Sequence, residues 1–151
     1  MEEAYNKINY TLVRLFNEIM ELEGRAIITD EFRDITNNDM HVIEAIGDGD
    51  GNNMTSVANA LGVTVGTLTS AVNSLVLKQY VTRRRTEKDR RVVIVQLTDK
   101  GKRAFEHHAH YHQMVTNAVV ERFGKEELPL LLKLLEALDD FFTSEKKRIG
   151  F

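Results

Sequence analysis

Two short helical segments joined by a single glycine constrain this chain more than any other feature of its sequence. Apolar periodicity predicts one helix over residues 54–61 and a second from 65 to about 79, with Gly62 as the turn between them. Asn53 and Thr64 precede the two helices and can cap their first turns. This pattern is typical of a helix-turn-helix, whose second helix is shaped to enter a major groove.

A strongly basic strand–turn–strand pattern follows the second helix. The runs 80–85 and 92–97 favour β-structure and flank a polar turn, which predicts a hairpin, or wing. Residues 83–91 carry five Arg and one Lys against Glu87 and Asp89, a local charge of +4 in a chain whose net charge is −3. Positive charge concentrated beside a groove-sized helix predicts contact with a polyanion, so double-stranded DNA is the expected partner.

Longer helices are expected on both sides of this region. The spacing of apolar residues predicts helices over 4–24, 37–46, about 98–123 and 125–147. The last helix has an apolar face broader than one subunit needs to cover, so we expect the first and last helices to form a dimerisation surface. A purely intramolecular core is the alternative. The expected fold class is mainly α with a small β-hairpin wing.

The composition excludes several other classes of protein. Without cysteine the chain forms neither a disulfide nor a thiolate metal site. Met1 is followed by Glu2 and Glu3 rather than by a basic segment and an apolar run, which argues against a signal peptide. No apolar stretch approaches the roughly 20 residues that span a bilayer. We therefore expect a soluble, cytoplasmic protein with no membrane partner.

The hairpin ends in a specific pattern, with Asp89 and Arg91 followed by Leu97-Thr98 and then Gly101. This spacing resembles the wing signature of the MarR family of winged helix-turn-helix repressors, and the resemblance extends over nearly the whole chain. It implies a homodimer on a pseudo-palindromic operator, with one recognition helix in each of two major grooves. The implied organisation of the single subunit 1–151 is a DNA-binding region at 36–98 with helical dimerisation regions at 1–35 and 99–151.

Two groups of residues are expected to contact DNA. Short polar residues on the second helix can bring hydroxyl, amide or backbone groups to phosphates and base edges. They are Thr64, Gly66, Thr67, Thr69, Ser70 and Asn73. The hairpin supplies charges for phosphates or the minor groove, and the resemblance implies that Asp89 and Arg91 fold its tip through an ion pair. This second group is Arg83, Arg84, Arg85, Lys88, Asp89, Arg90 and Arg91.

Within the family, residues 38–47, 63–70 and 89–93 resemble the fatty-acid-synthesis repressor branch, which uses long-chain acyl-carrier protein as corepressor. The resemblance implies an acyl ligand or acyl-carrier protein as effector, held in a pocket that is apolar within and polar at its mouth. The candidate pocket residues are Phe16, Ile19, Met40, His41, Ile43, His108 and His112. Simple core packing is the alternative for the apolar members, and no cofactor is required for DNA binding.

Histidines suggest a second effector. His108 and His112 are four residues apart, so they share one helix face and could grip one metal ion, with His41 as a third ligand. Zinc-responsive members of the family are similar here, but they have a carboxylate immediately before the histidine that corresponds to His41, and they have a cysteine upstream. This chain has Met40 at the carboxylate position and contains no cysteine. Zinc therefore stays as an alternative, and His107 and His110 are expected at the surface.

The sequence thus predicts a homodimeric transcription regulator, a repressor by its resemblance, whose effector changes the spacing of two recognition helices. The operator, the effector and the sign of its effect stay open. A metal-dependent hydrolase is the remote alternative, because Glu106 lies beside the histidines. The sequence contains no His-Glu-x-x-His, no nucleophile elbow and no phosphate-binding glycine loop, so we do not expect an enzyme.

Overall fold

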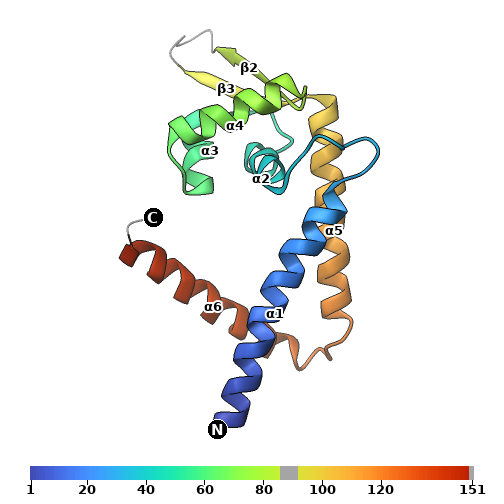
Figure 1. The fold of residues 1–151 in the computed structure, drawn as a ribbon, viewed down its shortest axis with the longest axis vertical. Helices are drawn as coiled ribbons and strands as arrows, with labels where there is room; N and C mark the ends of the chain where they lie inside the picture. The colour runs from blue at the N-terminus through green and yellow to red at the C-terminus, as the bar shows by residue number, and fades with distance from the viewer. Residues whose placement is uncertain (86–91, 150–151) are drawn as a thin grey trace. The chain divides into compact units, whose positions relative to one another are not determined.

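The structure is a computed structural model that describes residues 1–85 and 92–149 (Figure 1). Its elements in chain order are α1 (Glu2–Ile27), α2 (Asn37–Ile46), β1 (Asn52–Asn53), α3 (Met54–Leu61), α4 (Val65–Leu77), β2 (Val81–Arg85), β3 (Val93–Leu97), α5 (Asp99–Val120) and α6 (Leu128–Ile149). The strands form one antiparallel sheet in the order β1-β3-β2. The chain divides into two compact units, 1–111 and 112–151.

Side-chain caps fix where α2, α3 and α4 begin, and the sequence predicted the caps of α3 and α4. The side-chain oxygens of Asn53 and Thr64 accept hydrogen bonds from the backbone N–H three residues later, at N···O distances of 2.9 and 3.1 Å. Thr36 and Asp39 form a complete capping box at the start of α2. Gly62 ends α3 with φ of 66°, a left-handed conformation that favours glycine. The helix-turn-helix is therefore specified largely by local signals.

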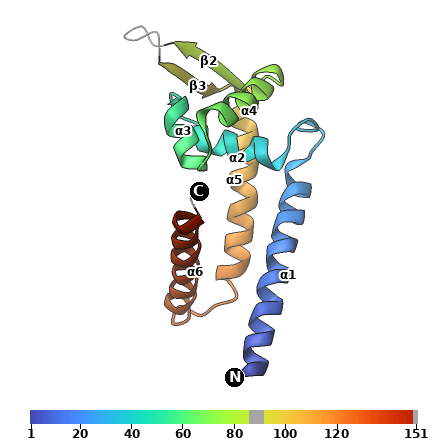
Figure 2. The same cartoon turned by 60° about the vertical axis from the view of Figure 1, so that its left-hand side comes forward.

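One apolar core joins α2, α3, α4 and the sheet. Leu68, Val72 and Leu75 of α4 form an almost completely buried stripe, and Val76 is exposed at its edge. The partners of this stripe are Met40, Ile43, Ile46, Val57, Ala58, Val81, Val95 and Leu97. In both views the hairpin of β2 and β3 lies beside α4 (Figures 1 and 2).

The ends of several elements differ from the sequence prediction. Gly24 does not stop α1, which continues to Ile27 because a glycine within a helix only weakens it. Strand β1 was not predicted, since two residues carry no readable periodicity. It is placed by Gly51, whose φ is 95° and whose added Cβ would lie 2.6 Å from the carbonyl oxygen of Val95. The loop before α3 therefore packs directly on β3.

The base of the hairpin is joined closely to the start of α5. The Thr98 hydroxyl donates to the carbonyl oxygen of Gln79 at 2.7 Å and accepts from the Gly101 N–H at 3.0 Å. A Cβ at Gly101 would lie 2.1 Å from the carbonyl oxygen of Tyr80. The Leu-Thr-x-x-Gly pattern is thus a packing requirement, because only glycine lets α5 approach the start of β2 this closely.

A polar cluster holds the connection between α1 and α2 on this junction. The Tyr80 hydroxyl donates to Asp34 Oδ1 at 2.8 Å, and Lys100 Nζ lies 4.0 Å above the Tyr80 ring and 3.5 Å from Asp34. Burial and the neighbouring carboxylate raise the pKa of Tyr80, so its hydroxyl stays a donor. Although desolvation opposes it, the Tyr80 hydrogen bond and Lys100 lower the pKa of Asp34, which keeps this cluster charged.

Among the described residues, no single helix has both the length and the apolar character needed to cross a bilayer. The helix pair α3 and α4 passes the same test by length and composition, but the two helices are bent by 105° relative to each other.

Substituting Gly101 should test the tight junction at the hairpin base. We expect Gly101→Ala to lower the free energy of unfolding by about 1–3 kcal/mol, because the new methyl group overpacks against the Tyr80 carbonyl. The measurement is denaturant unfolding at matched protein concentration. Gly49→Ala is the control, since its Cβ would meet nothing within 4 Å, and it should change stability by less than about 0.5 kcal/mol. Equal stability of the two variants would contradict the packing explanation.

Candidate nucleic-acid interface

The outer face of α4 and its N-cap carry the six residues that the sequence singled out on this helix. Thr69 is half-buried, and the other five residues are exposed. The Thr64 hydroxyl caps the helix and lies 3.0 Å from that of Thr67, and the Thr69 hydroxyl donates to the Val65 carbonyl oxygen at 2.7 Å. These hydroxyls are therefore partly engaged within the helix, while Ser70 extends from the exposed face.

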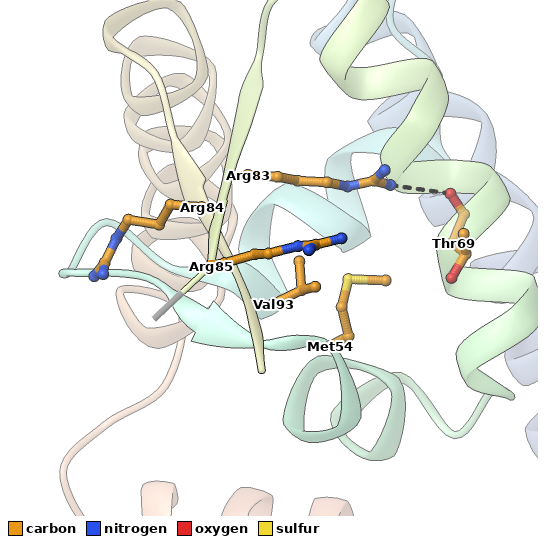
Figure 3. A pocket seen from close by; sticks show the side chains of 6 residues that line it. All are labelled: Met54, Thr69, Arg83, Arg84, Arg85 and Val93. Carbon is orange, nitrogen blue, oxygen red and sulfur yellow. Dashed lines mark hydrogen bonds between the residues drawn. The ribbon is translucent and has the colours of Figure 1, made fainter. Parts of the chain in front are cut away.

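Three consecutive arginines of β2 lie in different surroundings because side chains alternate along a strand. Arg83 and Arg85 extend toward α4, whereas Arg84 extends to the opposite side (Figure 3). Arg83 donates to Asn73 Oδ1 at 2.6 Å and to the Thr69 carbonyl oxygen at 3.3 Å. Arg84 donates to the Asp50 carbonyl oxygen at 3.2 Å. The hairpin is thus bonded to α4 on one side and to the loop before α3 on the other.

A cationic hollow of about 360 Å³ opens between α3, α4 and the hairpin (Figure 3). It is lined by Met54, Thr69, Arg83, Arg84, Arg85 and Val93. Guanidinium groups are donors only and form strong charge-assisted hydrogen bonds with phosphate oxygens. A surface with these groups beside an exposed, hydroxyl-bearing helix can bind the backbone of a nucleic acid while the helix meets base edges. The remaining predicted hairpin contacts, Lys88, Asp89, Arg90 and Arg91, and the proposed Asp89–Arg91 ion pair lie outside the described residues.

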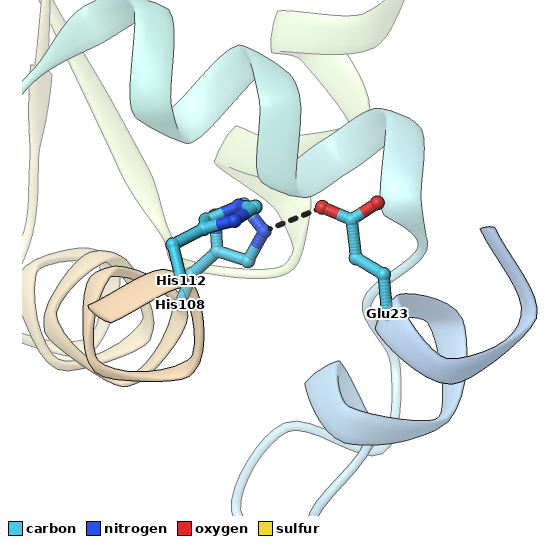
Figure 4. Close-up of side chains that lie close together, drawn as sticks. All are labelled: Glu23, His108 and His112. Carbon is cyan, nitrogen blue, oxygen red and sulfur yellow. Dashed lines mark hydrogen bonds and ion pairs between the residues drawn. The ribbon is translucent and has the colours of Figure 1, made fainter. Parts of the chain in front are cut away.

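A second polar group lies away from this surface, where the end of α1 meets α5 (Figure 4). His108 is 2% exposed, and its Nε2 lies 3.0 Å from Oε1 of Glu23, which is 5% exposed. His41 Nε2 lies 3.8 Å from the same oxygen, and the rings of His41 and His108 are 6.4 Å apart. Sequence reasoning missed Glu23. The available signal was its spacing from Ile27. Residues four apart share one face of a helix, so Glu23 lies on the same buried face of α1 as Ile27.

The donor atoms of this group suit a divalent metal. Ligand atoms of Glu23, His108 and His112 all lie within 4.8 Å of one another, and His112 follows His108 by one turn of the continuous helix α5. A carboxylate oxygen with two imidazole nitrogens is a donor set that zinc accepts. Two of the three predicted metal-ligand histidines are thus grouped by the structure with a carboxylate, and the third, His41, is adjacent to that carboxylate.

The other two histidines of α5 differ from each other. His110 is exposed, as predicted. The prediction was wrong for His107, which is half-buried, with Nε2 2.8 Å from the Ala26 carbonyl oxygen and its ring 5.7 Å from that of Phe32. The reason is that α1 continues past Gly24, so its last turn covers this side of α5.

The candidate effector residues occupy three kinds of environment. Met40 and Ile43 have no exposed surface and belong to the core of the first unit. Phe16 and Ile19, by contrast, are 66% and 55% exposed on α1. His41 and His108 belong to the polar group beside Glu23. Of these candidate residues, those on α1 therefore offer exposed apolar surface, whereas those on α2 do not.

Comparison with known proteins gives one consistent result. The model of the family described as transcriptional regulator SarA/Rot matches residues 26–108. The chain is similar to Streptococcus pneumoniae FabT, solved in complex with DNA, with 33% identity and a TM-score of 0.86 over 94% of this chain and 99% of that one. It is 24% identical to YpoP, an uncharacterized HTH-type transcriptional regulator of Bacillus subtilis (strain 168), over 92% of this chain and 91% of YpoP.

The S. aureus MepR–DNA complex shares the fold at 21% identity, with a TM-score of 0.70 over 87% of this chain and 96% of that one. The arginine-bearing hairpin and the exposed α4 therefore occur in the same fold as solved DNA complexes of regulators. The chain belongs to the SarA/Rot family of transcriptional regulators, and it is a DNA-binding winged-helix protein of the MarR type.

Proposed function

We propose that this protein is a homodimeric repressor that binds a pseudo-palindromic operator through α4 and the β2–β3 hairpin. The observation that carries the proposal is the cationic hollow beside the exposed face of α4. Arg85 extends toward α4 at this hollow without a hydrogen-bond partner among the described residues (Figure 3). Such a group can neutralise a phosphate without first breaking a hydrogen bond to any described residue.

A second copy of the chain is the proposed partner of the apolar surfaces on α1 and α6. Each helix exposes a row of large apolar side chains, and α6 buries none of its residues within the subunit. On α1 these include Leu12, Phe16 and Ile19, and on α6 Leu135 and Phe141. Soluble proteins rarely leave such surfaces in water, and two-fold pairing would cover them.

Two-fold pairing also accounts for operator geometry. A dimer would present two copies of α4 to successive major grooves, whose centres lie about 10 base pairs apart on one face of the duplex. An effector that binds one spacing of the two helices better than another would change operator affinity by that difference in binding free energy.

Removing Arg85 should weaken binding to every duplex. We expect Arg85→Ala to lower affinity for operator and random DNA alike and to reduce the slope of log K against log salt by about 0.9 for each phosphate that the protein no longer neutralises. Fluorescence anisotropy from 50 to 200 mM salt measures both quantities. Arg33→Ala is the matched control, because Arg33 is an exposed arginine outside the interface, paired with Asp30 at 2.7 Å. An unchanged slope for Arg85→Ala would exclude this arginine from phosphate binding.

For the effector we propose a long-chain acyl group delivered by acyl-carrier protein, acting as corepressor of fatty-acid synthesis genes. The resemblance of three stretches to the fatty-acid-synthesis repressor branch supports this assignment, and so does the overall likeness to FabT. The exposed apolar face of α1 at Phe16 and Ile19 offers surface for an acyl chain, and Glu23, further along α1, forms the polar group with His108 of α5.

Long-chain acyl-carrier protein should strengthen binding to duplexes taken from upstream of fatty-acid synthesis genes. An increase of about 5- to 150-fold is the range of ordinary allosteric coupling. Electrophoretic mobility shifts with and without the acylated carrier measure the effect, and unacylated carrier protein is the control. An equal effect of both carriers, or weaker binding with the acylated one, would contradict the corepressor assignment.

A zinc-responsive regulator is the second candidate, supported by the grouping of Glu23 with His108 and His112. In this proposal Glu23 supplies a carboxylate oxygen, the two histidines of α5 supply imidazole nitrogens, and His41 is close enough to join them. The ion, a Lewis acid, would bind ligands from both α1 and α5 and would thereby cross-link the two helices. Binding would have to displace the 3.0 Å contact between His108 and Glu23, so affinity would depend on the protonation of these groups.

Metal binding can be tested independently of DNA. Binding of one Co²⁺ per protomer should give the visible absorption of a low-symmetry site, and Zn²⁺ should displace the Co²⁺ ion. Glu23→Gln and His112→Ala should each weaken binding by at least about tenfold. His110→Ala is the control, because this histidine is exposed on α5. Equal loss in the control variant, or no Co²⁺ spectrum in the wild type, would leave only the acyl proposal.

A further inference from the structure

Arg83 joins the hairpin to the recognition helix at two points. Its Nη1 donates to Asn73 Oδ1 at 2.6 Å and its Nη2 donates to the Thr69 carbonyl oxygen at 3.3 Å. Thr69 and Asn73 are four residues apart, so one planar guanidinium spans a full turn on one face of α4. In the sheet Arg83 pairs with Val95, which is completely buried. The arginine is therefore attached to a rigid strand and holds the helix from there.

This contact fixes which end of the Asn73 amide is free. A guanidinium has five donors and no acceptor, so the atom that faces it must be the amide oxygen. The amide NH₂ group is then the part directed away from Arg83, and Asn73 is an exposed residue of the outer face of α4. A free asparagine pairs with adenine through both its oxygen and its nitrogen. Here Arg83 occupies one lone pair of the oxygen and turns it toward the hairpin, so the NH₂ donor group is the part that the side chain presents away from Arg83.

We propose that Arg83 is a positioning residue that determines base specificity by holding Asn73 as a hydrogen-bond donor. The inference rests on the proposed binding of an operator by α4. A donor in the major groove selects base edges that accept; guanine presents two acceptors, O6 and N7, whereas adenine N7 and thymine O4 are single acceptors. Cytosine presents the N4 donor and is disfavoured. The expected result is a guanine at one symmetric position in each half-site, selected by Asn73.

The two neighbouring arginines do not share this task. Arg84 lies on the opposite side of β2 and donates to the Asp50 carbonyl oxygen at 3.2 Å. Arg85 lies on the same side as Arg83, but no described residue accepts a hydrogen bond from it (Figure 3). Loss of Arg85 should therefore reduce affinity without altering base preference, which makes Arg85→Ala the matched control for Arg83→Ala.

Selection of bound duplexes from a random library, followed by sequencing, tests the proposal with the full-length protein. The wild type should select guanine at the Asn73 position. Arg83→Ala frees the amide to rotate, so preference at that one position should fall by at least about fivefold while the rest of the motif is retained. Asn73→Asp keeps the pairing with Arg83 but removes both donors, so cytosine should replace guanine. Arg85→Ala should select the wild-type motif.

Other outcomes are equally decisive. An Arg83→Ala variant that selects the wild-type motif with lower affinity would overturn the proposal and place Arg83 with the phosphate contacts. So would an Asn73→Asp variant whose preference at this position is unchanged. Thermal unfolding of each variant shows whether it is folded, and Asn73→Asp provides a variant in which the hairpin stays bonded to α4. A wild-type protein that enriches no motif would instead contradict sequence-specific binding itself, and this inference with it.

Discussion

The burial of one stripe of α4 controls the placement of the whole interface. Leu68, Val72 and Leu75 are between 0 and 1% exposed, and each contributes about 1.5–3 kcal/mol through removal of its side chain from water. Because the helix repeats every 3.6 residues, fixing these three fixes the rotation of the helix about its axis. The outward direction of Ser70 and Asn73 follows from this rotation, and Arg83 then orients the Asn73 amide. The exposure of the polar face of α4 thus begins with apolar packing on the opposite side of the helix.

The pleat of β2 has a comparable effect on the hairpin. Alternation gives three chemically identical arginines different surroundings, so that Arg83 contacts the helix, Arg84 contacts a loop, and Arg85 extends beside the helix. A shift of register by one residue would exchange these surroundings. The register is secured by the close approach of Gly101 to the Tyr80 carbonyl at the base of the hairpin. The close packing at Gly101 consequently helps to decide which way each arginine of β2 extends.

Sequence alone predicted the elements whose signals are local. Asn53 and Thr64 cap the two helices of the DNA-binding region, as their positions before apolar runs indicated. Features that depend on distant contacts were not accessible in the same way. The continuation of α1 past Gly24 and the pairing of Glu23 with His108 both require knowledge of how α1 meets α5, 85 residues later in the chain. A charge run likewise shows where arginines gather but not which of them are already bonded within the protein.

The central claim is that two copies of this chain hold one duplex through α4 and the hairpin. Sedimentation velocity of a fluorescently labelled duplex, selected from a random library and mixed with the protein, measures stoichiometry and preference together. The account predicts two protomers on each duplex and an affinity at least about 10³-fold above that for a scrambled duplex of equal length at physiological salt. A single protomer per duplex, or equal affinity for the scrambled duplex, would contradict it.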